Sequence, residues 1–402
     1  MALIIKNTNY NGEVLGRIFT LAVMGCQIVE KGLICVIPNV DKKMSLPRLK
    51  VGKMLQKPKE MPRLEDAKGN YEYSEHELNP EEFMAFTTFN PNTLYNIWRQ
   101  FQPKGDLVFT ELPPSAQNAM LDALSRQVKF ELGWHYINGK AGNTDDELFN
   151  GILYRILQDK DVIRISSSET TMIKKLYDLK AAVPEPIKEH PNLRIIMSPA
   201  DFEQYDLELT NREHKNSDET RLNEKSFKGI KIETLVGWPS GLLIATLCGP
   251  DEMSNLFAGV HLPDDENVIQ IDKYMNAGEL YFFKMKMKVD TAIAFGEEIV
   301  VLDTRTNPEF APSITLSLQS KTFDAAGGSQ KITVTSTSGY KIGAVPSGYS
   351  VEDGDGKFTV TASANTGATA VTGTIEVCLA NNPAIKKTLS LTTSAPEEVP
   401  AG

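Results

Sequence analysis

Histidine and cysteine, the side chains that most often do chemistry in proteins, are few in this sequence and do not cluster. The chain contains five histidines, which lie far apart: His76, His135, His190, His214 and His261. Four of them fall in segments with a loop or turn pattern, and no catalytic constellation forms around them. His135 follows Trp134 in a helical pattern, which favours a histidine packed in the core.

The remaining motifs also predict no active site. The four cysteines form no C-x-x-C pair, so we expect reduced, buried and inert thiols at Cys26, Cys35, Cys248 and Cys378. The sequence has no Walker loop, H-E-x-x-H, G-x-S-x-G or G-x-G-x-x-G motif. Asp353 and Asp355 lack the other ligands of a calcium loop, so a hairpin turn explains them better. Acidic groups at Glu252 and 264–266 have no partnering base. We expect no enzyme activity, no cofactor and no metal.

The most unusual charge pattern lies between residues 42 and 82. Residues 42–68 contain nine bases and three acids, a formal charge of +6 (9 − 3), and residues 69–82 then contain five glutamates and no Lys or Arg. Residues 66–70 are a good turn between the two halves. The pattern predicts a protruding hairpin with a basic and an acidic limb. The limbs could be a solvated loop, could meet opposite charges on another subunit, or, as the third choice, could bind nucleic acid, for which interleaved aromatic residues are absent.

The longest regular pattern, residues 114–137, predicts a long core helix. Pro113 and Pro114 fix its entry and Ser115 caps it. One apolar stripe has helical spacing: Ala116, Met120, Ala123, Leu124, Val128 and Leu132. A second stripe predicts that the helix is covered on two sides: Leu121, Phe130, Trp134 and Ile137. A left-handed stop is expected at Asn138-Gly139, and a shorter helix follows from apolar residues between 148 and 157.

Other patterns divide the chain into further units. Residues 1–40 predict an extended or partly helical arm, and 92–100 a short helix. Alternating strands and helices between 162 and 271 indicate a compact α/β unit, and strict alternation in 281–289 predicts a long half-buried strand, with another strand at 299–302. Residues 313–394 carry short β runs with turns at 327–328, 348 and 353–356, which favours a separate immunoglobulin-type sandwich, before a tail (395–402) disordered by composition.

Length and composition limit the function classes. A chain of 402 residues with 41% hydrophobic content can form two or three domains, and its formal charge of −10 argues against a general nucleic-acid binder. No apolar run approaches the length of a membrane span. Residues 18–26 loosely resemble a lipoprotein cleavage site, but Glu13 precedes them and Met24 stands where a small residue is usual. An intracellular product is the better expectation.

The order of these segments resembles the major capsid protein of tailed phages, the Hong Kong 97-type fold. The resemblance rests on WHYING (134–139), LFNGILYRIL (148–157), NLRIIMSPADFEQY (192–205), the segment 227–272 with its SNLFAGV step, and LYFFKMKMKVDTAIAFGEEIVVL (280–302). It implies an α+β chain with these parts: an N-terminal arm 1–40, an extended loop 41–76, a peripheral domain 77–165 with the spine helix, an axial domain 166–272, and peripheral return strands 273–306.

In that family the chain assembles into pentamers and hexamers of an icosahedral head around double-stranded DNA and catalyses nothing. The resemblance implies assembly in the host cytoplasm, a place in the virion and no membrane. It implies as partners further copies of the chain, a portal, a separate scaffold, decoration or cement proteins, and DNA bound only non-specifically. The charged hairpin would lie over an adjacent subunit, where opposite charges set the register. The candidates for that inter-subunit contact are Lys50, Lys53, Lys57, Lys59, Glu75, Glu77 and Glu81.

The C-terminal part (312–394) resembles immunoglobulin-like domains of the BACON type. AAGGSQKITVTSTSGYKI and FTVTASANTGATAVTGTIEV carry the likeness, which implies a domain displayed on the capsid surface and weak glycan binding. Tyr340 stands where tryptophan is common and a terminal glutamine is missing, which puts the glycan inference in doubt. The alternative function is a secreted or lipid-anchored adhesin with a glycan-binding module, and it predicts an acylated Cys26.

Overall fold

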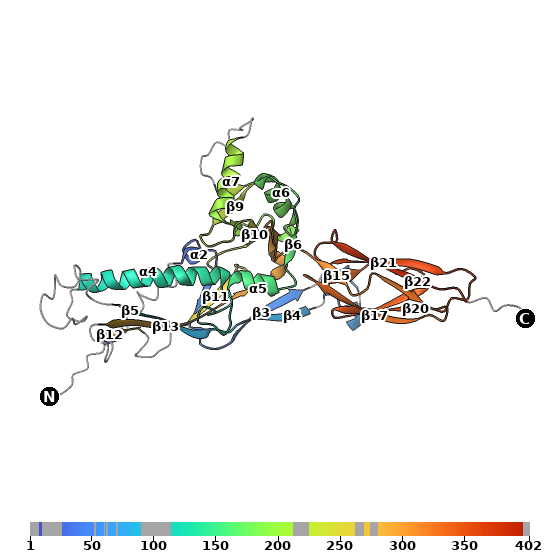
Figure 1. Ribbon diagram of the computed structural model, residues 1–402, viewed down its shortest axis with the longest axis horizontal. Coiled ribbons are helices and arrows are strands. Elements are labelled where there is room, and N and C mark those ends of the chain that lie inside the picture. Colours follow the sequence, from blue (N-terminus) through green and yellow to red (C-terminus); the bar gives the residue numbers. More distant parts are fainter. Residues whose placement is uncertain are drawn as a thin grey trace, which may run out of the picture.

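A computed structural model describes residues 8–9, 26–51, 54–59, 61, 63–69, 71–89, 114–211, 225–261, 269–273 and 280–396. The described part is elongated, with the long helix α4 (Pro114–Asn138) toward one end and a β-rich C-terminal unit at the other. Helices α6 (Met172–Ala182) and α7 (Pro199–Thr210) project to one side between them (Figure 1). The predicted helix at 92–100 and the tail from 397 lie outside the described residues.

The first sheet is built around the 13-residue strand β13 (Tyr281–Ile293). β5 (Glu81–Phe89) pairs with one edge of β13, while β11 (Leu256–His261) and β12 (Ile269–Lys273) share the other edge. β1 (Thr8–Asn9) continues the sheet beyond β12, and β2 (Cys35–Pro38) runs parallel to β11. The predicted alternation is confirmed, because every second side chain of 281–289 is buried while the lysines between them are only half-buried.

Helices α4 and α5 (Ile152–Gln158) pack together, and α5 also contacts β13. Leu132 and Tyr136 of α4, Ile152 of α5 and Met285 of β13 belong to one buried apolar cluster. The predicted spine helix is therefore confirmed, with 25 residues and a length of ~37 Å at the usual rise. Its predicted two-sided cover is wrong, because Phe130 and Trp134 are 65% and 47% exposed. Among the described residues, no element covers these two side chains.

The end of α4 depends on glycine for a reason that the sequence pattern did not show. Helix α4 stops at Asn138, close to the predicted end. Gly139 does not have a positive φ, so the predicted left-handed stop is wrong. A Cβ at Gly139 would lie 2.5 Å from the carbonyl oxygen of His135 and 2.6 Å from that of Phe149. Gly151 donates its N–H to Gly139 O at 2.8 Å. Two glycines thus let the chain cross itself closely where α5 begins.

The second sheet has the order β6-β14-β10-β7-β9-β8. Its strands are β6 (Ile163–Ile165), β7 (Leu193–Met197), β8 (Ser226–Phe227), β9 (Ile230–Thr234), β10 (Leu242–Leu247) and β14 (Val300–Asp303). Helices α6 and α7 share a buried cluster with it that includes Leu176, Ile195 and Leu243. Ser198 caps α7, because its Oγ accepts the N–H of Asp201 at 3.1 Å.

The expected axial segment (166–272) and the expected return strands (273–306) each contribute strands to both sheets. β11 and β12 fall within 166–272, the expected axial segment, yet they pair with β13 of the first sheet. β14 falls within 273–306, the expected return strands, yet it pairs with β10 and β6 of the second sheet. We call the described residues up to 310 the body. Strand pairing joins residues far apart in sequence, so contiguous sequence ranges cannot divide the body into its two sheets. The strand patterns of β5 and β11 were also missed.

Part of the predicted N-terminal arm lies inside the body. Cys26, Ile28, Leu33 and Ile34 are each 1% exposed and belong to the main apolar cluster. The short helix α2 (Gln27–Glu30) and strand β2 hold this segment. From residue 26 onward the segment is therefore a core element of its own chain, whereas residues 10–25 lie outside the described residues.

Residues 314–393 form two four-stranded sheets on a common core. One has the order β15-β17-β20-β19 and the other β16-β22-β21-β18. The strands are β15 (Ile314–Leu316), β16 (Ser320–Phe323), β17 (Gly328–Ser336), β18 (Tyr340–Ile342), β19 (Tyr349–Gly354), β20 (Lys357–Ala362), β21 (Val371–Leu379) and β22 (Lys386–Thr393). Ile332, Phe358, Ile375 and Leu389 are buried between the sheets. Asp353 and Asp355 lie at the β19–β20 hairpin, as predicted.

Candidate assembly surfaces

A two-stranded hairpin carries the charged segment that the sequence singled out. β3 (Met44–Val51) and β4 (Tyr71–Leu78) pair antiparallel, from Met44 opposite Leu78 to Val51 opposite Tyr71. Gly69 in the connecting segment has φ of 96°, a conformation that favours glycine. The predicted hairpin is confirmed. Its antiparallel register also brings the basic limb alongside the acidic one within the same chain.

The seven predicted contact residues fall into different situations. Lys50 stands opposite Glu72 and Glu75 opposite Pro47 in the strand register, and Lys53 lies outside the described residues. Lys59 makes an ion pair with Asp66, and Glu77 makes one with Lys43 at 2.5 Å. The hydrogen bond from Lys59, together with the N–H of Arg63, lowers the pKa of Asp66. Lys57 and Glu81 are exposed. Some charges of the limbs are thus paired within the hairpin itself, and such exposed ion pairs contribute little to stability.

The root of the hairpin contacts the body through polar side chains on two sides. Asp41, just before β3, accepts from Lys288 Nζ at 2.5 Å and lies 3.5 Å from His261 Nε2. The hydrogen bond from Lys288 lowers the pKa of the Asp41 carboxyl. On the other limb, His76 Nε2 lies 3.6 Å from Asp159. His76 and His261 were expected in loops or turns but lie in strands β4 and β11.

A buried ion pair stands directly after the acidic limb. Arg155 donates through one Nη2 to both oxygens of Asp290 at 2.8 Å, and Asn79 N–H donates to the same carboxylate at 2.8 Å. Burial raises the pKa of Asp290, although Arg155 and the Asn79 N–H act in the opposite direction. Because a buried charge without its partner is costly, this contact ties α5, β13 and the end of the hairpin into one unit.

Two apolar surfaces were not found from the sequence. The first is a groove of about 550 Å³ beside α4, whose lining includes Cys26, Phe130, Trp134, Ile137 and Val236. The second is the hairpin tip, where Leu55 and Met61 are 97% and 85% exposed. Contiguous exposed apolar surface marks contact sites, whereas single exposed apolar residues are common, so the groove is the stronger candidate of the two. The helical stripe at Phe130 and Trp134 was visible in the sequence, but its pattern does not reveal whether a partner element covers it.

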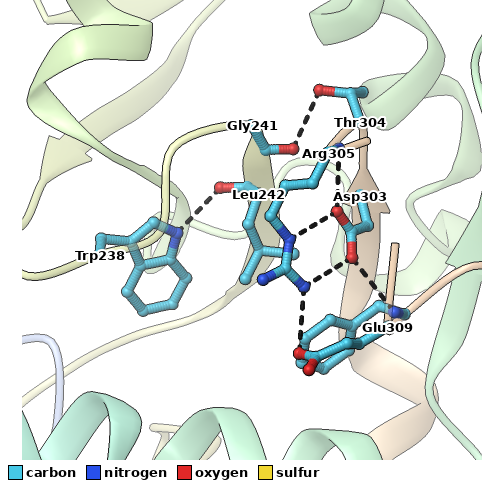
Figure 2. Close-up of polar contacts among 8 residues, drawn as sticks. Trp238, Gly241, Leu242, Asp303, Thr304, Arg305 and Glu309 are labelled. Carbon is cyan, nitrogen blue, oxygen red and sulfur yellow. Dashed lines mark hydrogen bonds and ion pairs between the residues drawn. The ribbon is translucent and has the colours of Figure 1, made fainter. Parts of the chain in front are cut away.

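The linker between the body and the C-terminal unit is held by a polar network (Figure 2). Asp303, the last residue of β14, accepts from Arg305 N at 3.1 Å, Nε at 2.9 Å and Nη2 at 2.8 Å, and from Phe310 N at 3.2 Å. Thr304 donates its N–H to Gly241 O at 2.8 Å. Burial alone would raise the pKa of Asp303, but these hydrogen bonds outweigh it and lower the pKa.

Chemistry-bearing side chains are dispersed within the described part of the chain. No group of three or more His, Cys, Asp or Glu side chains there could hold a metal ion. Cys26, Cys35 and Cys248 are buried, as predicted, and burial raises the pKa of Cys26 and of Cys248 to about 12. Cys378 is only half-buried, contrary to the prediction, because it lies on β21 at the surface of the C-terminal unit. None of the described helices is long and apolar enough to cross a membrane.

Comparison with known proteins identifies the fold. No family model and no curated protein matches the sequence. Among solved structures, a chain of the satellite phage P4 procapsid that includes the size determination (Sid) protein matches with a TM-score of 0.54 and 12% identity, over 74% of this chain and 93% of that one. A capsid chain of an empty GTA particle (TM-score 0.43, 11% identity, 75% and 93%) and a virus-like particle from Pyrococcus furiosus (0.41, 12%, 73% and 100%) are weaker matches. The expectation of an α+β capsid-protein fold is confirmed.

Proposed function

We propose that this chain is a major capsid protein of a tailed phage, which assembles into hexamers and pentamers of an icosahedral head around double-stranded DNA. One observation carries the proposal: the chain shares the fold of the P4 procapsid chain over 93% of that chain's length. The exposed hairpin and helix surfaces support it, because they are apolar or charged features that the monomer leaves uncovered. We assign the chain a structural role without catalysis.

We further propose that the seven hairpin residues contact a neighbouring subunit, as the charge pattern predicted. Lys57 and Glu81 carry this most directly, since both are exposed and neither makes an ion pair with another described residue of its own chain. Lys59 and Glu77 would have to exchange or share their present partners. The proposed location is the virion, after assembly in the host cytoplasm, with a portal, a scaffold and decoration proteins as further partners.

The C-terminal unit is proposed to be an immunoglobulin-like domain on the outside of the shell. Two four-stranded sheets around a single core support that class. Glycan binding finds little support, because carbohydrate sites commonly use an exposed aromatic face. The four aromatic side chains of 313–396 are buried or half-buried. The Tyr340 hydroxyl oxygen lies 2.7 Å from both Asp353 Oδ1 and Gly354 O, which are its hydrogen-bond acceptors.

The adhesin alternative is not favoured by the position of Cys26. Acylation would require its thiol to lie outside the fold, whereas the side chain is 1% exposed and its Sγ donates to Lys129 O at 3.4 Å. Intact-mass analysis distinguishes the two functions, because only the adhesin predicts a lipid on Cys26.

Electron microscopy of the purified full-length chain tests the proposal. We expect closed shells, or hexamers and pentamers, and a mass distribution far above the 44.5 kDa of one chain. To promote assembly in the absence of a scaffold, the measurement is repeated at high protein concentration and with a crowding agent, which both favour association. A chain that stays monomeric under all of these conditions would contradict assembly of the chain by itself, and a chain that stays monomeric together with its scaffold would contradict the proposed function.

A further inference from the structure

The linker of the C-terminal unit is folded into the body and does not form a free tether. Phe310 is 2% exposed and belongs to the main apolar cluster of the body. The guanidinium of Arg305 lies 5.8 Å from the centre of the Phe310 ring, and the same group donates to Glu309 at 3.3 Å. Figure 2 shows the Arg305 guanidinium between the carboxylates of Asp303 and Glu309. The chain therefore leaves the body at a fixed point just after residue 310.

A buried arginine of the body reaches across to the C-terminal unit close to that exit point. Arg164 of β6 is 5% exposed, and its guanidinium donates to the carbonyl oxygens of Ile156 at 3.2 Å and Leu157 at 2.8 Å. These carbonyls end α5, so the cation also meets the negative end of the helix dipole. The other Nη donates to Thr337 O, between β17 and β18. Thr337 N–H in turn donates to Ser313 O at 3.0 Å, which braces the acceptor.

A second anchor lies on a different loop of the C-terminal unit. Asn381, in the turn between β21 and β22, donates its Nδ2 to Asp161 O at 2.8 Å. Its neighbour Asn382 donates to Arg164 O at 3.4 Å. All of the acceptors on the body are main-chain carbonyls of 161–164, so their positions are set by the backbone of the segment leading into β6 and do not depend on rotamers.

We propose that residues 161–164 are a docking platform that holds the C-terminal unit in one orientation on the body. A linker alone would leave the unit free to rotate, and domain motion is the usual expectation when an interface is small. Here the linker, the Arg164–Thr337 contact and the 381–382 turn attach the unit through separate loops, which removes that rotation. The platform lies within a single chain and does not depend on whether the proposed shell forms. If the shell does form, every subunit presents the unit at the same angle.

Distance measurement between two spin labels tests the platform. We would place labels by Glu203→Cys on α7 and Glu352→Cys on β19, both exposed, in a chain carrying Cys378→Ser. Labelled chains are diluted into excess unlabelled chain, so that distances within one subunit dominate. We expect a single narrow distance peak. In the Asn381→Ala/Asn382→Ala variant the peak should widen about twofold, because the attachment through the 381–382 turn is lost while the linker and the Arg164–Thr337 contact stay.

The asparagine variant is chosen because it changes only side chains at the surface of the C-terminal unit, whereas Arg164→Ala would also strip the end of α5. Lys331→Ala, exposed on β17, is the matched control and should keep the narrow peak. A broad distance distribution in the parent chain would overturn the proposal, and so would an unchanged peak in the asparagine variant. Both results can be read from monomers, so they are independent of the test for shells.

Discussion

Asp303 shows how one buried carboxylate can fix the path of a chain. Its side chain has no exposed surface, and it accepts hydrogen bonds from two main-chain N–H groups and from the Arg305 guanidinium. Arg305 is 25% exposed at its side chain, so the pair is screened on one side only. The net effect of these contacts is to lower the pKa of Asp303 below its ordinary value. The ionised carboxylate is therefore the form that these contacts stabilise.

Replacing this carboxylate changes how stability depends on pH. Because the folded pKa lies below the ordinary value of about 3.9, ionised Asp303 stabilises the fold above that pH, and the contribution is lost as the pH falls through the lower folded value. We expect Asp303→Asn to be less stable at pH 7 by roughly 1–3 kcal/mol and to lose less stability in acid than the parent. Urea unfolding followed by tryptophan fluorescence from pH 7 to pH 3 measures both, since all three tryptophans (Trp98, Trp134 and Trp238) precede the linker. Equal slopes in acid would contradict this role.

At the scale of the element, helix α4 has one face packed on the core and another that is exposed. Leu124 packs against the main apolar cluster, whereas Phe130 on the same helix is 65% exposed and lines the groove. Leu124→Asp places a charge against the core, so we expect insoluble protein, at a cost of several kcal/mol for an unpaired charge. Phe130→Asp should remain soluble and folded but assemble poorly, because it alters only the uncovered face. Circular dichroism, solubility and electron microscopy separate the two outcomes. Normal shells from Phe130→Asp would show that the groove takes no part in assembly.

The hairpin is the second element whose role can be tested by charge. Reversing Lys50, Lys53 and Lys57 to Glu should leave the body folded. Among the described hairpin side chains, the apolar contacts with the body come from Leu78 at the root, which is buried, and Leu46, which packs on a small cluster around Phe257. Assembly should fail at low salt and recover as salt screens the new repulsion. Adding the reversal of Glu75, Glu77 and Glu81 to Lys should partly restore assembly, if the two limbs meet across subunits.

A single substitution makes the hairpin test cleaner. Lys50 faces Glu72 across the strand pair, so its reversal also places like charges together within the hairpin. Lys57→Glu avoids that side effect, and Lys331→Glu on β17 applies the same charge change elsewhere as a control. We expect a salt-dependent loss of shells only for Lys57→Glu. Shells that form normally at low salt in the triple variant would mean that the hairpin is a solvated loop.

At the scale of the whole molecule, the body and the C-terminal unit have separate cores, and the chain passes from one core to the other between residues 310 and 314. Phe310 belongs to the body cluster, whereas Ile314 belongs to the cluster of the C-terminal unit. A chain ending at residue 311 should therefore fold and assemble. A chain ending at residue 306 loses Phe310 and should be less stable by about 3–5 kcal/mol, the usual cost of removing a buried Phe side chain. Thermal unfolding and electron microscopy of the two truncated chains provide the comparison. If both behave alike, Phe310 does not belong to the body.

The sequence by itself determined the local elements of this protein. Proline at the start of α4, the alternation of 281–289 and the cap at Ser198 each act through residues within a few positions, so their patterns are readable without the fold. The predicted cap at Ser115 is wrong, because α4 already begins at Pro114. The charge arrangement of 42–82 likewise predicted the hairpin, because a turn between two extended limbs is a local event. The order of these elements was enough to point to a capsid-protein fold.

Only the tertiary structure decided which elements share a sheet and which surfaces stay uncovered. β14 joins β10, and residues 26–38 enter the core beside β11, through contacts between positions more than fifty residues apart. No local pattern encodes such pairings, because they are selected by the total burial that the whole chain can achieve. For the same reason the stripe at Phe130 and Trp134 looked like a second core face. Its exposure follows from the absence of a covering element among the described residues, which is a property of the whole fold and not of the helix.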